Sequence, residues 1–191
     1  MRVAVMQPYF LPYLGYFQLL KSVDTFVFFD DVYFIKRGWI NRNSILVQGK
    51  ACRFTIPLDK ASQNLSIQDI RLHVDEYPRW REKFLKTVEQ TYRTAPYFKQ
   101  GFMLIKNLLH EESFTIAELA ISSIRMIADY LDINTKILRS SSLDYQREGN
   151  GEYKIVSICN LLQASTYVNA IGGINLYDQR SFSDIILVSK P

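Results

Sequence analysis

Short apolar runs alternate with amphipathic stretches along this chain. Arg2–Met6 (RVAVM) and Thr25–Phe29 (TFVFF) are continuous apolar runs with the length of buried strands. Between them, Leu14–Lys21 carries apolar residues at helical spacing, which predicts a helix. A strand, a helix and a second strand within residues 2–29 make a βαβ unit, and such units imply a parallel sheet.

The two periodicities continue through the rest of the chain. Gln48–Gly49 separates two strand-like runs, Ser44–Val47 and Lys50–Ile56, and predicts a hairpin that adds antiparallel strands to the sheet. Thr115 and Glu118 form a capping-box pattern at the head of an amphipathic helix. The other expected elements are a loop or short edge strand at Ala61–Ile70, helices at Tyr77–Tyr92, Pro96–His110 and Glu152–Gln163, a helical turn at Tyr177–Arg180, and strands at Thr135–Arg139, Thr166–Asn169 and Asp184–Val188.

Strands that alternate with helices predict the α/β fold class. We expect a Rossmann-like three-layer αβα arrangement around a mostly parallel sheet, with an added β-hairpin. The length of 191 residues favours one domain, so residues 1–191 are predicted to form a single α/β domain with a helical insertion at about 75–131.

Composition and charge narrow the ligand class. Hydrophobic residues make up 48% of the chain and charged residues 22%, which is enough for a sizeable core. The net charge of +4 suits an anionic ligand such as a nucleotide or sugar nucleotide, and it is too small to indicate nucleic acid. The 14% of aromatic residues is explained either by an aromatic-rich core or by a stacking surface for a sugar or base.

Cysteine and histidine usage argues against disulfides and metal. The two cysteines, Cys52 and Cys159, show no metal-ligand spacing, which favours a reduced, cytoplasmic protein. His73 and His110 each lack a second ligand at helical spacing, so no metal site is expected. The apolar run before Pro8 is too short for a signal peptide, and no run has the length of a transmembrane segment. The absence of GxGxxG and Walker patterns disfavours the usual dinucleotide and P-loop enzymes.

The turn after the first strand, Gln7–Gly15 (QPYFLPYLG), is the first candidate site. Ligands of open parallel sheets bind at the carboxyl ends of strands, beside such turns. Two prolines stiffen the turn, and Gly15 leaves room for a backbone or phosphate to approach the helix start. The tyrosine rings either fill space beneath the turn or contact a ligand. The expected substrate-binding residues of this turn are Gln7, Tyr9, Tyr13, Gly15 and Tyr16.

The connection after the second strand, Asp30 to Ile45, combines carboxylates, cations, an indole ring and amides. Arginine binds phosphate or carboxylate with two parallel hydrogen bonds, and lysine adds a mobile point charge. The alternative is that these charges pair with one another on a solvated loop. We expect catalytic roles for Asp30, Asp31, Lys36 and Arg37, with one aspartate as general base, and substrate-binding roles for Trp39, Asn41, Arg42 and Asn43.

Two further polar segments follow predicted strands. Gly172 and Gly173 can form a backbone nest for an anion, although a tight turn is the commoner role of such a pair. Ser140–Ser142 either donates hydrogen bonds to a phosphate or makes a polar turn. We expect the turn after the first strand and the connection after the second to form two walls of one pocket for an anionic small molecule.

Three stretches together resemble the WbqC-like protein family of bacteria. They are MQPYFLPYLGYFQLL (Met6–Leu20), FDDVYFIKRGWINRN (Phe29–Asn43) and TYVNAIGGINLYD (Thr166–Asp178), and the resemblance covers essentially the whole chain. It implies a role in O-antigen, lipopolysaccharide or other surface-polysaccharide biosynthesis, where some members are described as glycine or aminoacyl transferases acting on amino sugars. Members of the family extend further at the C-terminus, so we expect this chain to be short there.

A fainter resemblance bears on the mechanism. Tyr13-Leu14-Gly15-Tyr16 has the spacing of the HxGH signature of nucleotidyltransferases and pantothenate-synthetase-like ligases, with tyrosine in place of both histidines. Gly15 keeps the role of the glycine in that signature. The histidine imidazolium groups, which would stabilise the charge of the leaving phosphate, are absent. Adenylation with ATP would then require Lys36, Arg37 or Arg42 to neutralise the phosphate charge.

The expected function is a transferase that attaches a glycine-like acyl or aminoacyl group to an amino sugar, through an adenylate. The alternatives are a non-catalytic nucleotide-sugar-binding or scaffold protein of the same pathway, and a nucleotidyltransferase. ATP is the candidate cofactor. The expected partners are a nucleotide or amino-sugar substrate and other polysaccharide-biosynthesis enzymes, with no nucleic acid. The sequence does not identify the sugar, the acyl donor or the oligomeric state.

Overall fold

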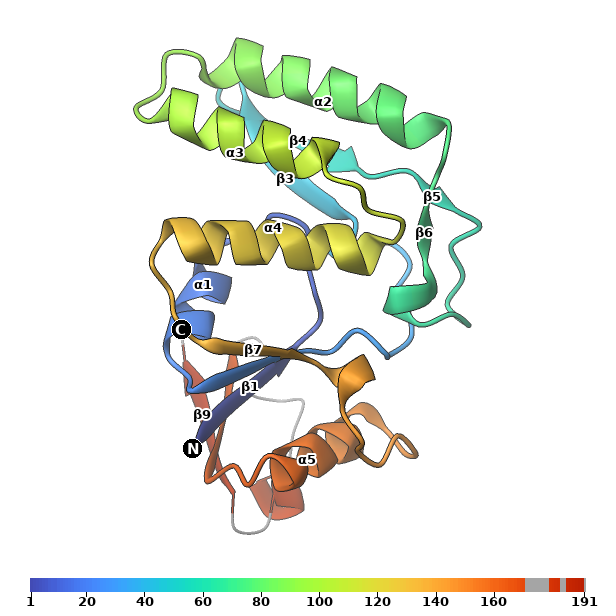
Figure 1. The fold of residues 1–191 in the computed structure, drawn as a ribbon, viewed down its shortest axis with the longest axis vertical. Helices are drawn as coiled ribbons and strands as arrows, with labels where there is room; N and C mark the ends of the chain where they lie inside the picture. Colours follow the sequence, from blue (N-terminus) through green and yellow to red (C-terminus); the bar gives the residue numbers. More distant parts are fainter. Residues whose placement is uncertain (171–178, 183–184, 191) are drawn as a thin grey trace. The chain divides into compact units, whose positions relative to one another are not determined.

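A computed structural model describes residues 1–170, 179–182 and 185–190 (Figure 1). The polypeptide divides into two compact units. Unit 1 comprises Met1–Gln7, Pro12–Val32 and Ala128–Pro191, and unit 2 comprises Pro8–Leu11 and Tyr33–Ile127. This division into units does not test the expectation of a single domain, which stays a prediction.

Unit 1 is built on a five-stranded parallel sheet. Its strand order is β7-β2-β1-β8-β9. Going outwards from β1, the strands follow in chain order on one side through β2 and β7, and on the other side through β8 and β9. All five strands therefore end at the same edge, and the order reverses between β1 and β8. The strands are β1 (Arg2–Met6), β2 (Thr25–Phe28), β7 (Lys136–Arg139), β8 (Thr166–Ala170) and β9 (Ile186–Lys190).

Helices cover both faces of this sheet, which confirms the three-layer α/β prediction. Figure 1 shows α1 (Leu14–Lys21) on one face and α5 (Gly151–Leu161) on the other. Alternate residues of each strand pack against the helices on opposite faces of the sheet, because successive side chains of a strand point to opposite sides. Phe26 packs its ring 5.4 Å from Tyr16 of α1, whereas Val27 belongs to the apolar cluster that includes Ile155 of α5.

Unit 2 contains the predicted hairpin, made of β3 (Arg42–Val47) and β4 (Lys50–Thr55). Its two turn residues have positive φ angles, 51° at Gln48 and 75° at Gly49, as hairpin turns require. The expectation that the hairpin extends the main sheet was wrong, because β3 and β4 form a separate two-stranded sheet. The apolar face of β4 packs on a helix instead, with the rings of Phe54 and Phe84 4.7 Å apart.

The helices of the expected insertion are present. Thr115 and Glu118 form the predicted capping box: the Glu118 N–H donates to Thr115 Oγ1 at 3.2 Å, and the Thr115 N–H donates to Glu118 Oε2 at 3.0 Å. One helix starts two residues later than Pro96, because Tyr97 is left-handed with φ 60° and the helix begins after it. The helices are α2 (Glu76–Tyr92), α3 (Phe98–His110) and α4 (Ile116–Tyr130).

The remaining elements are short. The stretch expected as a loop or edge strand holds the 3₁₀ turn η1 (Ile67–Asp69) and leads into β6 (Arg71–Leu72), which pairs with β5 (Leu58–Asp59). Two more 3₁₀ turns are η2 (Ser140–Ser142) and η4 (Gln179–Phe182). Of the helical turn expected at 177–180, residues 179–180 belong to η4, and residues 177–178 lie outside the described residues. Among the described residues, none of the helices combines the length and the hydrophobicity that crossing a bilayer requires.

Candidate functional site

The candidate site of unit 1 is the edge of the sheet where its parallel strands end. In sheets of this kind ligands bind outside the carboxyl ends, at the point where the strand order reverses. Here that point lies between β1 and β8. The residues that follow the strands at this edge are Gln7 after β1, Asp30 and Asp31 shortly after β2, and Ser140 after β7.

Asp30 is fully buried and fully hydrogen-bonded. Its Oδ2 accepts from Arg139 Nε at 2.6 Å and from Ser141 Oγ at 2.9 Å, and its Oδ1 accepts from the Ser141 N–H at 3.0 Å and Ser140 Oγ at 3.1 Å. The donors come together because β2 and β7 are parallel neighbours with Phe28 opposite Arg139. A buried carboxylate needs such a set of donors and a counter-charge, since burying it alone is costly.

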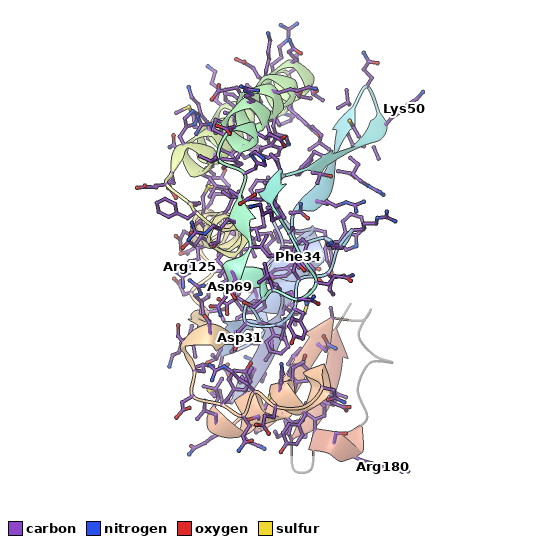
Figure 2. The ribbon with its side chains drawn as sticks, turned by 90° about the vertical axis from the view of Figure 1, so that its right-hand side faces the viewer. Asp31, Phe34, Lys50, Asp69, Arg125 and Arg180 are labelled. Atoms are coloured by element: carbon purple, nitrogen blue, oxygen red, sulfur yellow. The ribbon has the colours of Figure 1, made fainter. Side chains whose placement is uncertain are left out.

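Asp31 has a second set of partners from the same segment. Its side chain is 5% exposed and accepts from the Tyr145 hydroxyl at 2.9 Å, from Arg147 Nε at 3.1 Å and from Ser140 Oγ (Asp31 is labelled in Figure 2). Burial and the hydrogen bond to the Asp31 carboxylate raise the pKa of Tyr145, so its hydroxyl stays a donor. The single hydroxyl hydrogen of Ser140 is shared between Oδ1 of Asp30 and Oδ1 of Asp31, and the hydroxyl oxygen accepts the Asp30 N–H at 3.1 Å.

These contacts bear on the general-base prediction for Asp30 or Asp31. Each oxygen of both carboxylates already accepts at least one hydrogen bond within unit 1. A base needs a free lone pair within reach of the proton that it removes. The base role stays a prediction, and the geometry favours a positioning role for the pair.

Sequence reasoning did not select Arg139, Tyr145 or Arg147. The two arginines pair with the aspartates more than a hundred positions before them, and only the strand order brings them together. The available signal was a charged residue at the carboxyl end of a predicted strand, as Arg139 is in TKILR. Ser140–Ser142 was expected either to bind a phosphate or to make a polar turn. The hydroxyls of Ser140 and Ser141 are hydrogen-bonded to Asp30 within the protein.

The tyrosines that flank Gly15 have different roles. Tyr16 is 1% exposed, packs on Phe26 and donates its hydroxyl to the Gln7 carbonyl at 3.0 Å, so it belongs to the core. Tyr13 is 61% exposed and precedes α1 as its N-cap residue. Of the two tyrosines that flank Gly15, the one that a ligand can reach is therefore Tyr13. Gln7 is half-buried at the end of β1.

Gly15 makes room for the ring of Tyr13. A Cβ atom at position 15 would lie 2.4 Å from Tyr13 Cε2, which is too close for two carbon atoms. We expect Gly15→Ala to displace this exposed ring while the protein keeps its thermal stability, because the ring can swing into solvent and alanine is compatible with a helix. The measurement is a melting curve with and without a nucleotide sugar. A normal ligand-induced rise in melting temperature would contradict a binding role for the Tyr13 ring; Tyr13→Ala, which keeps Gly15, is the control.

In unit 2 the two predicted segments are hydrogen-bonded to each other. The Phe10 N–H donates to the Ile40 carbonyl at 3.1 Å, and the Asn43 amide donates to the carbonyls of Leu11 at 2.6 Å and Phe10 at 3.3 Å. Asn41 donates its amide to the Ile56 carbonyl at 2.9 Å. Both asparagine side chains therefore use their amide groups to hydrogen-bond backbone carbonyls within unit 2. Tyr9, in the same segment, is half-buried.

The cations of the connection have no carboxylate partner in the described part of the chain. Among the residues that the structure describes, no ion pair involves Lys36, Arg37 or Arg42. The alternative that the charges of this stretch pair with one another is therefore not seen. Trp39 is exposed, and the Arg53 guanidinium lies 5.9 Å from its ring centroid, within cation–π range.

Arg37 also has an unusual backbone. Its φ angle is +63°, in the left-handed region that non-glycine residues seldom occupy. The turn is closed by a hydrogen bond from the Gly38 N–H to the Ile35 carbonyl at 3.1 Å. Backbone conformations of this kind cluster at functional sites.

The predicted site residues fall into three groups. Gln7, Tyr13, Gly15, Tyr16, Asp30 and Asp31 lie in unit 1, whereas Tyr9, Lys36, Arg37, Trp39, Asn41, Arg42 and Asn43 lie in unit 2. Gly172 and Gly173 lie outside the described residues. In the described part of the chain, no group of three or more His, Cys, Asp or Glu side chains is arranged to hold a metal ion.

Comparisons with known proteins agree with the resemblance drawn from the motifs. A relative from Mycobacterium tuberculosis, "Uncharacterized protein Rv1507c", is 26% identical over 185 residues, which cover 96% of this chain and 78% of the relative. No solved structure matches. The model of the WbqC-like protein family matches residues 7–186, nearly the whole chain, and so the protein belongs to the WbqC-like protein family.

Proposed function

We propose that this protein is a transferase that attaches a small acyl or aminoacyl group, such as glycyl, to an amino sugar in surface-polysaccharide biosynthesis. The observation that carries the proposal is the parallel sheet of unit 1, whose strand order reverses between β1 and β8. In open parallel sheets, nucleotides and related ligands bind at such a reversal of strand order. The long motif that follows β1 is one of the stretches shared with the family.

The proposed reaction has two balanced steps. The carboxylate of the donor attacks the α-phosphorus of ATP, which forms an acyl adenylate and releases pyrophosphate. The amine of the sugar then attacks the acyl carbon; a C–N bond forms, AMP leaves with the electron pair of the broken C–O bond, and the amine loses a proton. Lys36, Arg37 and Arg42 are proposed to neutralise phosphate charge, because none of them is paired with a carboxylate among the described residues.

The aspartates have a different role in this proposal. Since Arg139, Arg147 and the neighbouring hydroxyls occupy their oxygens, Asp30 and Asp31 hold the ends of β2 and β7 in place. The proton of the attacking amine is released to water or to the departing AMP.

One observation favours a second candidate, a non-catalytic protein that binds nucleotide sugars. The two carboxylates at the sheet edge are committed to internal contacts, which leaves no free acid–base pair at this edge among the described residues. A nucleotidyltransferase is the third candidate.

One assay separates the three candidates. Purified protein is incubated with ATP, glycine and a panel of nucleotide-linked amino sugars, and products are identified by mass spectrometry. The transferase predicts an amide with an equal amount of AMP, and no amide from a sugar whose amine is already acetylated. Pyrophosphate release that requires neither glycine nor an acceptor amine indicates nucleotidyl transfer. A rise in melting temperature without product indicates binding alone, since a ligand stabilises the state that it binds. The absence of both a product and a shift in melting temperature would contradict all three candidates.

A further inference from the structure

Unit 2 contains a cavity of about 470 Å³ that no predicted site residue lines. It lies where β5, β6, the first turn of α2 and the segment before α4 come together, and Figure 1 shows β6 leading into α2. Its volume falls in the range of sites for small molecules. The residues that line it are Asp59, Arg71, Leu72, His73, Val74, Tyr77, Pro78, Ser113 and Phe114.

Backbone hydrogen bonds fix the walls of this cavity. The His73 N–H donates to the Pro57 carbonyl at 3.1 Å, and the Leu72 N–H donates to the Phe114 carbonyl at 3.0 Å. The Tyr77 N–H donates to the His73 carbonyl at 2.9 Å, which links the start of α2 to the residue that follows β6. The cavity is therefore preformed, so a ligand need not order a loop to bind.

Opposite charges stand side by side in this cavity. Asp59 and Arg71 are directly opposed in the β5–β6 pair, so their side chains lie on one face of that pair. No ion pair joins them or involves either of them among the described residues. A free carboxylate beside a free guanidinium can bind an ammonium group and a carboxylate at the same time.

His73 lines the same cavity, and both of its ring nitrogens face Glu76. Its Nδ1 accepts the Glu76 N–H at 3.3 Å, and its Nε2 lies 4.0 Å from Glu76 Oε1, so the ring is not free to bind a ligand carboxylate. The hydroxyl of Tyr77 is committed elsewhere, since it donates to the Leu109 carbonyl at 3.4 Å, and burial raises the pKa of Tyr77 to about 12. Tyr77 therefore offers its ring to the cavity.

Apolar side chains flank these charges and are left uncovered. Val74 is 80% exposed and Phe114 is 63% exposed, and both line the cavity. Covering such side chains with an apolar group is favourable by roughly 25 cal/mol per Å² removed from water. The cavity thus suits a molecule with two opposite charges and an apolar body.

We propose that this cavity binds a small zwitterion of the amino-acid type with an apolar side chain. Arg71 receives its carboxylate, Asp59 receives its ammonium group, and Val74 and Phe114 cover its side chain. A phosphate dianion fits less well, because Asp59 repels it. The inference goes beyond the proposed transferase activity and does not depend on it.

The test measures binding of three probes to the whole protein by calorimetry. L-Phenylalanine carries both charges, phenethylamine lacks the carboxylate, and 3-phenylpropanoate lacks the ammonium group. We expect the zwitterion to bind roughly ten-fold or more tightly than either analogue, because each analogue leaves one charged group unpaired. No binding of L-phenylalanine at millimolar concentration, or equal binding of all three probes, would overturn the proposal.

Two variants assign the contacts. Arg71→Gln should abolish the preference for L-phenylalanine over phenethylamine, and Asp59→Asn should abolish its preference over 3-phenylpropanoate. Both side chains are exposed, so both variants should fold, and each reports on its own half of the site. Arg125→Gln is the matched control, because Arg125 is an exposed arginine of α4 that does not line the cavity. Retention of both preferences in both variants would refute the assignment.

Discussion

Replacement of Asp30 by asparagine is expected to lower the free energy of unfolding by roughly 3–5 kcal/mol. The carboxylate is fully buried and accepts from Arg139, Ser140 and Ser141. Asparagine has nearly the same shape, but it carries no charge and turns one acceptor into a donor. The guanidinium of Arg139 then loses its counter-charge, and one donor group faces another.

Chemical denaturation followed by circular dichroism measures this loss. The matched control is Asp24→Asn, which breaks the exposed Arg2–Asp24 ion pair of the same unit and should shift the denaturation midpoint little. The double variant with Arg139→Gln should lose less than the sum of the single losses, because the two groups act as a pair. Equal stability of Asp30→Asn and the parent protein would show that the buried network is not needed for the fold.

Replacement of Arg37 by glycine is expected to reduce amide formation by about 100-fold or more without destabilising the protein. Arg37 has no carboxylate partner in the described residues, so its charge is available to a phosphate. Glycine adopts a φ angle of +63° without steric cost, which offsets the greater flexibility that it gives the unfolded chain. The free energy of unfolding should therefore change by less than about 1 kcal/mol.

Gln48→Gly provides the matched control for the backbone. Gln48 has a φ angle of +51° in the turn of the β3–β4 hairpin and lies outside the predicted site. The Gln48→Gly variant should show the same small change in the free energy of unfolding as Arg37→Gly, and it should form amide at the parent rate. A folded Arg37→Gly variant that forms amide at the parent rate would remove Arg37 from the proposed mechanism. Equal losses in both variants would assign the effect to the backbone.

Local pattern predicted the elements well. β1 and α1 have the predicted bounds, and the capping box at Thr115 and Glu118 forms as its spacing indicated. These features depend on residues within a few positions of one another, so the periodicity of the side chains is enough to reveal them. The prediction for the hairpin was right in its strands and turn and wrong in its place, since β4 buries Phe54 against α2.

The sequence by itself determined the βαβ start of the fold, the parallel character of the sheet and the stretches that resemble the family, two of which are the long motifs after β1 and β2. Only the tertiary structure decided what the polar and aromatic residues of those motifs do. Tyr13 and Tyr16 are three positions apart, yet one is exposed and the other is in the core. Asp30 pairs with Arg139, 109 positions away, because β7 lies beside β2. Strand order is a long-range property set by how the helices and strands pack together, and short-range spacing carries no record of it.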